Sequence, residues 1–219
     1  VNSSGVVGSD VTGVGTARHG LAAANFGGDK AIFGYGYSSA ARIATTNLVS
    51  NEGVVASDTS GVGSVRYHLA AATYGGDKAI FGYGNTGSMV SITNLVSSSG
   101  VVATDTTGVG TARNGLAAAG YGTDKAIFGY GNGGGDVSMT NLVNNSGVVA
   151  SDVSGVGTAR AELAATSYGG DKAIFGYGST GSNVSVTNLV NTSGVVAADV
   201  SGVGSERNTL AAAGYSFST

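Results

Sequence analysis

The sequence predicts an all-β fold, a β-propeller built from tandem units of about 47 residues. The decapeptide GGDKAIFGYG at residues 27–36 returns almost unchanged at 75–84, 122–131 and 169–178. An arginine recurs at positions 18, 66, 113, 160 and 207, with separations of 48, 47, 47 and 47 residues. A period of this length holds four short strands with their turns, as a propeller blade does, and it exceeds one coil of a simple β-solenoid.

Each unit is predicted to form four strands, which in the first unit are residues 18–26, 29–36, 41–50 and 53–58. Sequences rich in Gly, Asn, Asp and Ser separate them and favour turns. Dense β-branched residues and glycines disfavour helix. In the second strand, alternation places Phe33 and Tyr35 on one face and Gly34 on the other. We therefore expect the aromatic face of each unit to pack against the glycine face of its neighbour.

The repeats predict a single domain over residues 1–219. Four complete blades are expected, at residues 18–58, 66–105, 113–152 and 160–199. The chain ends, residues 1–10 and 207–219, are expected to share a fifth blade, because propellers commonly join their first and last segments in one blade. This fifth blade would be incomplete, because only its outer and inner strands are present. Another segment then fills it, or the ring carries a gap.

The repeated pattern R-x-x-L-A-A-A-x-Y-G-G-D-K-A-I-F-G-Y-G, followed by TNLV and GVVA segments, resembles the kelch-type repeat of β-propellers over essentially the whole chain. In that family an arginine precedes the innermost strand and a glycine pair closes the second strand. Here Gly-Tyr-Gly replaces the glycine pair and the family's tryptophan is absent. The resemblance implies a kelch-like propeller. The near-identical units are also similar to propeller-like repeat segments of bacteriophage structural and tail proteins.

The composition excludes several classes of function. Charged residues make up 11% of the chain, the net charge is -3 and no basic run occurs, so we expect no nucleic-acid partner. Apolar runs are too short for a membrane span. The absence of cysteine removes disulfides, thiolate catalysis and cysteine-based zinc sites. Two histidines without an evident carboxylate partner do not form a metal-binding pattern. We expect no metal and no cofactor.

An aspartate lies eight residues before each repeated arginine, at the far end of a GVG connector. We expect structural ion pairs between blades, or arginines that clamp the carbonyls of the connector, because a guanidinium group holds several acceptors. A ligand-binding ring of arginines is the alternative. The residues concerned are Asp10, Arg18, Asp58, Arg66, Asp105, Arg113, Asp152, Arg160, Asp199 and Arg207.

Differences between the units are concentrated in two places, the loop after the second strand and the two residues after each arginine. In a four-stranded antiparallel blade both places emerge on the same face. Variable loops on a rigid scaffold are the usual site of recognition, although exposed loops also vary without a function. The candidate ligand-binding residues are His19, Tyr37, Arg42, Tyr67, His68, Asn85, Met89, Asn114, Asn132, Asp136, Glu162, Asn183 and Asn208.

These features favour a non-enzymatic recognition module that binds a carbohydrate or a protein surface, as in a lectin-like adhesion component of a virion or tail. No catalytic residue is identified, because the acids outside the repeat positions are scattered over different blades. The alternative is a purely structural repeat protein that assembles as a homo-oligomer or within a larger particle. An extracellular or virion-associated location is favoured, although the sequence leaves the compartment open.

Overall fold

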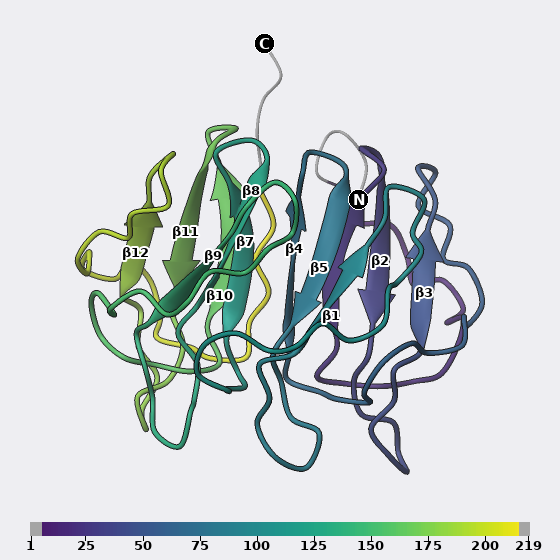
Figure 1. Cartoon of the computed structure of the whole chain (residues 1–219), viewed down its shortest axis with the longest axis horizontal. Helices are drawn as coiled ribbons and strands as arrows, with labels where there is room; N and C mark the ends of the chain where they lie inside the picture. Colours follow the sequence, from purple (N-terminus) through teal and green to yellow (C-terminus); the bar gives the residue numbers. More distant parts are fainter. Residues whose placement is uncertain (1–5, 215–219) are drawn as a thin grey trace.

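The computed structural model describes residues 6–214, and within this range it contains twelve β-strands and no helix. The outermost residues, 1–5 and 215–219, lie outside the described part. All twelve strands come from the four complete units (Figure 1). They are β1 (Ala22–Phe26), β2 (Lys30–Gly34), β3 (Thr46–Val49), β4 (Ala70–Tyr74), β5 (Lys78–Gly82), β6 (Thr93–Val96), β7 (Ala117–Tyr121), β8 (Lys125–Gly129), β9 (Thr140–Val143), β10 (Ala164–Tyr168), β11 (Lys172–Gly176) and β12 (Thr187–Val190).

The strands form four antiparallel sheets of three consecutive strands each, named here sheet 1 (β1-β2-β3), sheet 2 (β4-β5-β6), sheet 3 (β7-β8-β9) and sheet 4 (β10-β11-β12). In sheet 1 the β1–β2 register runs from Ala22 opposite Gly34 to Phe26 opposite Lys30. Gly27 and Gly28 turn the chain between these strands with φ of 61° and 83°, a region that glycine enters at little cost. The other sheets repeat this register.

The expected fourth strand, residues 53–58 and its equivalents, does not form a regular strand. It lies beside β3 through two isolated bridges, Val49 with Val55 and Thr46 with Thr59. Three positions separate the two bridges along β3, and four separate them along the outer segment. One extra residue therefore breaks the ladder, as in a β-bulge. The side-chain amide of Asn47 also donates a hydrogen bond to the Ala56 carbonyl, at 3.1 Å, in place of a backbone partner.

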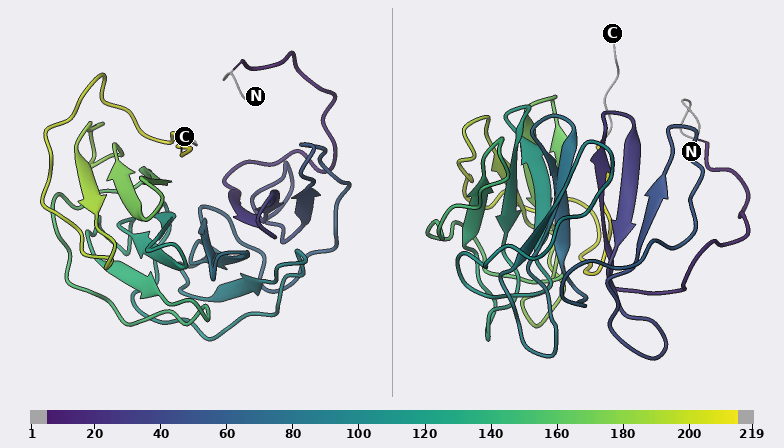
Figure 2. Two further views of the ribbon diagram at one scale, coloured as in Figure 1. Left: turned by 90° about the horizontal axis from the view of Figure 1, so that it is seen from above. Right: turned by 45° about the vertical axis from the view of Figure 1, so that its right-hand side comes forward.

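The four sheets stand side by side along an arc (Figure 2). Strands β1, β4, β7 and β10 contact one another in sequence and line the inside of the arc. Equivalent strands begin at residues 22, 70, 117 and 164, which reproduces the period read from the sequence. The arc is open between sheet 1 and sheet 4, and both described chain ends lie toward this opening. The arrangement fits a repeat protein with propeller-like architecture.

Packing between sheets follows the expected fit of a large side chain against a glycine. A Cβ atom placed on Gly34 would lie 2.7 Å from Cζ of Phe81, so only glycine leaves room for this ring. The same 2.7 Å relation joins Gly82 to Phe128 and Gly129 to Phe175. The rings of Phe81, Phe128 and Phe175 are fully buried. Three successive interfaces thus use one packing solution.

The expectation that Tyr35 shares a face with Phe33 is wrong. Tyr35 has a φ of 64°, and its equivalents Tyr83, Tyr130 and Tyr177 have φ of 62–63°. A left-handed residue breaks the alternation of a strand, so the side chain turns toward the next sheet. There Tyr35 meets Phe81 edge-on, with ring centroids 5.2 Å apart. Tyr35 is fully buried, whereas Phe33 is 36% exposed.

Candidate functional site

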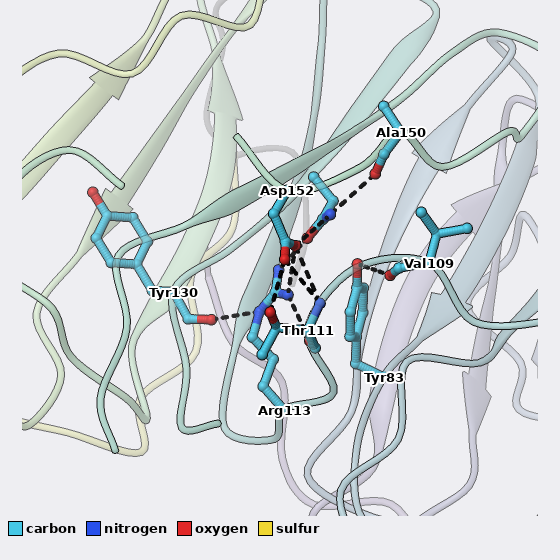
Figure 3. Close-up of polar contacts among 8 residues, drawn as sticks. Tyr83, Val109, Thr111, Arg113, Tyr130, Ala150 and Asp152 are labelled. Atoms are coloured by element: carbon cyan, nitrogen blue, oxygen red, sulfur yellow. Dashed lines mark hydrogen bonds and ion pairs between the residues drawn. The ribbon is translucent and has the colours of Figure 1, made fainter. Parts of the chain in front are cut away.

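The repeated arginine is the centre of a buried polar cluster (Figure 3). The guanidinium of Arg113 donates to the carbonyls of Tyr130 (2.8 Å) and Thr111 (3.0 Å) and to Oδ1 of Asn141 (2.6 Å). Asn141 in turn donates to Oδ1 of Asp152, at 2.9 Å. Arg66, Arg113 and Arg160 have no exposed surface. The expected contact between arginine and a connector carbonyl is present, and the cluster supports a structural role for these arginines.

The aspartates that face Arg18, Arg66 and Arg113 are not the ones eight residues before them. Arg113 lies 3.9 Å from Asp152, and Asp105 lies 3.9 Å from Arg66. Asp152 also accepts hydrogen bonds from the backbone N–H (3.0 Å) and the hydroxyl (2.7 Å) of Thr111. The bulged outer segment returns to the connector at which its own unit begins, so these ion pairs lie within a unit, and the expected pairing between units is wrong for these arginines. Arg18 and Asp58 form the same pair.

A tyrosine from the preceding unit completes the clusters of Arg66, Arg113 and Arg160. The guanidinium of Arg113 lies 4.3 Å from the ring centroid of Tyr83, and the Tyr83 hydroxyl donates to the Val109 carbonyl at 3.2 Å. Burial raises the pKa of Tyr83 to about 12, and burial also lowers the pKa of Arg113. These contacts join consecutive units, since Tyr83 directly follows β5 of sheet 2 and Arg113 precedes β7 of sheet 3. The arginine thus contacts the preceding unit through a cation–π contact and not through an ion pair.

The positions that vary between units lie together, as expected. After Arg18, Arg66, Arg113 and Arg160, the first residue bridges to the first residue of its unit's variable loop, which bridges to the end of that loop. These three-residue ladders form in all four units. They comprise His19-Tyr37-Arg42, Tyr67-Asn85-Met89, Asn114-Asn132-Asp136 and Ala161-Ser179-Asn183. We call the surface that they form the loop face.

Aromatic side chains gather on the loop face at the junction of the first two units. The rings of Tyr37 and Tyr67 meet edge-on at a centroid distance of 5.5 Å. His19 lies 5.7 Å from Tyr37, and His68 lies 4.5 Å from Tyr67. Arg42 stacks over Tyr67 at 5.5 Å. The first two ladders therefore supply a half-buried aromatic platform with one cationic edge.

A pocket of about 470 Å³ opens beside this platform. Residues from three successive units line it, and six of the thirteen candidate residues are among them: Tyr67, His68, Asn114, Asn132, Asp136 and Glu162. The side chains of these six include an aromatic ring, an imidazole, two amides and two carboxylates. The structure thus brings together candidates that are up to 95 positions apart in the chain. We call this cavity the loop-face pocket.

A chain of backbone hydrogen bonds holds the inner rim of the loop-face pocket. The N–H of His68 donates to Gly20, that of Gly115 to His68, that of Glu162 to Gly115 and that of Thr209 to Glu162, at 2.7–3.0 Å. Each of the five positions has a positive φ, between 49° and 61°. Such a φ costs a non-glycine residue of order 1 kcal/mol. His68 and Glu162 are therefore held in place at a cost in backbone energy.

Residues of the rim also line a second pocket of about 380 Å³, where His19, His68 and Glu162 meet the leucines that directly precede β1, β4, β7 and β10. Burial lowers the pKa of His68, the charge of His19 lowers it further, and the charge of Glu162 opposes both. Asn208 donates to Oε2 of Glu162 at 2.8 Å. The described residues contain no group of three or more His, Asp or Glu side chains that could hold a metal ion.

Seven candidates lie outside the loop-face pocket, and all of them except Asn208 belong to the ladders of the loop face. Asn85 uses its side-chain oxygen to accept from Gly87 within its own loop, at 2.8 Å. Inside the pocket, Asn132 accepts from Gly134 in the same way, at 3.1 Å, and donates to Asp136 at 3.1 Å. Outside the pocket are His19, Tyr37, Arg42, Asn85, Met89, Asn183 and Asn208.

Sequence reasoning missed Ala161, Ser179 and Gly181, which also line the loop-face pocket. Ala161 and Ser179 belong to the varying positions, but their small side chains carry no chemical signal. It also missed a smaller pocket of about 250 Å³ at the opposite end of the inner strands. Asn25, Thr73, Gly120 and Ser167 occupy one varying repeat position there, and two of them bind a neighbour's carbonyl: Thr73 that of Asn25 and Ser167 that of Gly120, both at 2.9 Å.

None of the described residues belongs to a helix that is long and apolar enough to cross a membrane. In comparisons with known proteins, no family model and no curated protein matches the chain.

Proposed function

We propose that the chain is a non-enzymatic recognition module that binds a carbohydrate in the loop-face pocket. The single observation that carries the proposal is the composition of this pocket, in which six residues at varying positions converge from three units. The strands β2 and β3, by contrast, have the same sequences as their equivalents in the other three units. Variation at a convergent cavity on a repeated scaffold is typical of a binding site.

A sugar fits the chemistry of this pocket. Carboxylates of Asp136 and Glu162 accept hydrogen bonds from hydroxyl groups, and the amides of Asn114 and Asn132 both donate and accept. Tyr67 offers an apolar ring at the side of the pocket, against which the C–H face of a pyranose can pack. The strained backbone at His68 and Glu162 supports a binding role, because strain of this kind is concentrated at functional positions.

The proposal includes the finer fold. We propose that the four sheets are blades of a kelch-like β-propeller and that the residues beyond them contribute to a fifth, incomplete blade. Three features support this: the open arc, the inner position of β1, β4, β7 and β10, and the blade-linking arginine. In a propeller the loop face is one face of the disc, on which binding loops from several blades converge. A virion or tail adhesion component would use such a face.

A glycan array probed with the full chain tests the proposal. We expect saturable binding to a defined group of glycans, at least tenfold weaker binding by Tyr67→Ala, and similar losses for Asp136→Asn. Asn183→Ala is the matched control, because Asn183 is an exposed loop-face residue outside the pocket. Binding to no glycan, or equal binding by Tyr67→Ala and the wild-type chain, would overturn the proposal.

A further inference from the structure

Sheet 4 carries one half of the interface that joins the other sheets, and among the described residues only the segment 207–212 lies against it. At the third interface, Phe175 packs in one cluster with Ala117, Ile127, Tyr130 and Leu163. The equivalent positions one unit later are Ala164, Ile174, Tyr177 and Leu210, and these line a cavity of about 230 Å³. We call this cavity the end socket.

The glycine at the floor of the end socket differs from its equivalents in its surroundings. At Gly34, Gly82 and Gly129 an added Cβ would lie 2.7 Å from a phenylalanine ring of the next sheet. Among the described residues, the same atom at Gly176 would meet only the Thr187 methyl group, at 3.3 Å. The φ of Gly176 is outside the left-handed region, so a side chain there meets no backbone strain. The space that a phenylalanine fills elsewhere is therefore present at Gly176.

The inner wall of the end socket is already in its repeat position. The Gly178 N–H donates to the Arg207 carbonyl at 3.0 Å, and the Arg207 guanidinium lies 4.0 Å from the ring centroid of Tyr177. Both contacts repeat those of Arg66 and Arg113 with their preceding units. Residues 210–212 then follow the path of an inner strand and line the socket, but the structure assigns them to no sheet.

We infer that the end socket receives a β-hairpin with the sequence pattern of β2 and β3, whose first strand reads Lys-Ala-Ile-Phe-Gly. In the register of the other sheets, its phenylalanine lies opposite Ala212, as Phe33 lies opposite Ala23, and points at Gly176. Its second strand covers Leu189, which is 40% exposed while its equivalent Leu142 packs against the next sheet. Unpaired strand edges accept an added strand in this way.

A hairpin is a better occupant than the intact first sheet of a second copy. Sheet 1 also presents an open side, on which Phe33 is 36% exposed. Sheet 1 brings its own inner strand, β1, and the place for that strand beside β10 is held by residues 207–212 through the Arg207 contacts. A hairpin of two strands meets no such competitor. This inference is independent of carbohydrate binding on the loop face.

The experiment uses the full chain and a fluorescent synthetic peptide of residues 171–190, which contains the strands β11 and β12. We expect a saturable rise in anisotropy with the wild-type chain. A peptide with Phe175→Ala should bind at least tenfold more weakly, since it lacks the ring that fills the socket. A chain with Gly176→Val should not bind the peptide, because the new side chain fills the socket from within.

Two further measurements keep this test decisive. The Gly176→Val chain should keep the far-UV circular dichroism of the wild-type chain, and Tyr67→Ala, which alters only the loop face, should bind the peptide normally. Equal binding of the two peptides, or no saturable binding, would overturn the inference. A dimer in native mass spectrometry that is lost in Gly176→Val and that excludes the peptide would also overturn it, in favour of a second copy as the occupant.

Discussion

The interior interfaces and the open end of the arc are built from the same repeated sequence, yet they differ in burial. Arg160, between sheets 3 and 4, is fully buried, whereas Arg207 at the open end is exposed. Phe175 is fully buried, and Phe33, on the open side of sheet 1, is 36% exposed. The difference teaches that a unit does not bury its own repeated arginine and phenylalanine side chains. Each unit depends on its neighbour, as in other repeat proteins.

The arginine cluster offers the largest test of this comparison. We expect Arg113→Met to lower the free energy of unfolding by about 5 kcal/mol, because it leaves Asp152, Asn141 and two carbonyls without their buried donor. Arg207→Met at the open end should cost less than about 1 kcal/mol, since water replaces the lost contacts. Urea denaturation followed by circular dichroism measures both. Equal losses of unfolding free energy would show that the contribution of the arginine to stability does not depend on the neighbouring unit.

The repeated phenylalanine should show the same difference between a buried interface and the open end, with a smaller loss of stability than the arginine. Phe128→Ala should cost about 3 to 4 kcal/mol, because it opens a cavity against Gly82 in a fully buried interface. Phe33→Ala removes the equivalent ring from the open side of sheet 1 and should cost about 1 kcal/mol. The same denaturation experiment compares them. A Phe33→Ala chain as unstable as Phe128→Ala would mean that Phe33 is covered in solution.

The smallest expected effect is the contribution of the ionised Asp152 carboxylate to stability at low pH. Burial alone would raise the pKa of Asp152, but hydrogen bonds from Thr111 and Asn141 outweigh it and the pKa is lowered. A lowered folded-state pKa contributes stability that is present above the unfolded value of about 4 and is lost as the pH falls through the folded value. The unfolding midpoint of the wild-type chain should therefore fall more steeply than that of Asp152→Asn below about pH 4. If the unfolding midpoints of the two chains change with pH in parallel, the ionised Asp152 carboxylate does not contribute to stability.

Much of the fold was predictable because it depends on local signals. The period, the turns at Gly27 and Gly28 and the strands β1, β2 and β3 follow from repeated turn chemistry and apolar alternation. The packing of phenylalanine against glycine also followed, since the two residue sizes are evident in one strand. The convergence of the varying loops on one face needed only antiparallel strand order, and the bridges between His19, Tyr37 and Arg42 confirm it.

Besides the pairing of aspartate with arginine, three features could not be predicted, and each has a physical reason. Tyr35 turns to the other side because its φ is positive, and no period of two contains that information. The outer segment loses strand character because one extra residue and the Asn47 side chain interrupt its ladder. The loop-face pocket gains Ser179 and Gly181, which only the spatial arrangement of three units brings to its wall.

The sequence by itself determined which residues are equivalent, how often the unit repeats and where the units differ, because these depend on identity and spacing along the chain. The tertiary structure alone decided which aspartate faces which arginine. Asp152 is 39 positions after Arg113, and Asp105 is eight before it, but the folded unit returns to its own connector. Proximity along the chain predicted the wrong aspartate, because the contacts of a buried guanidinium depend on the tertiary structure around it.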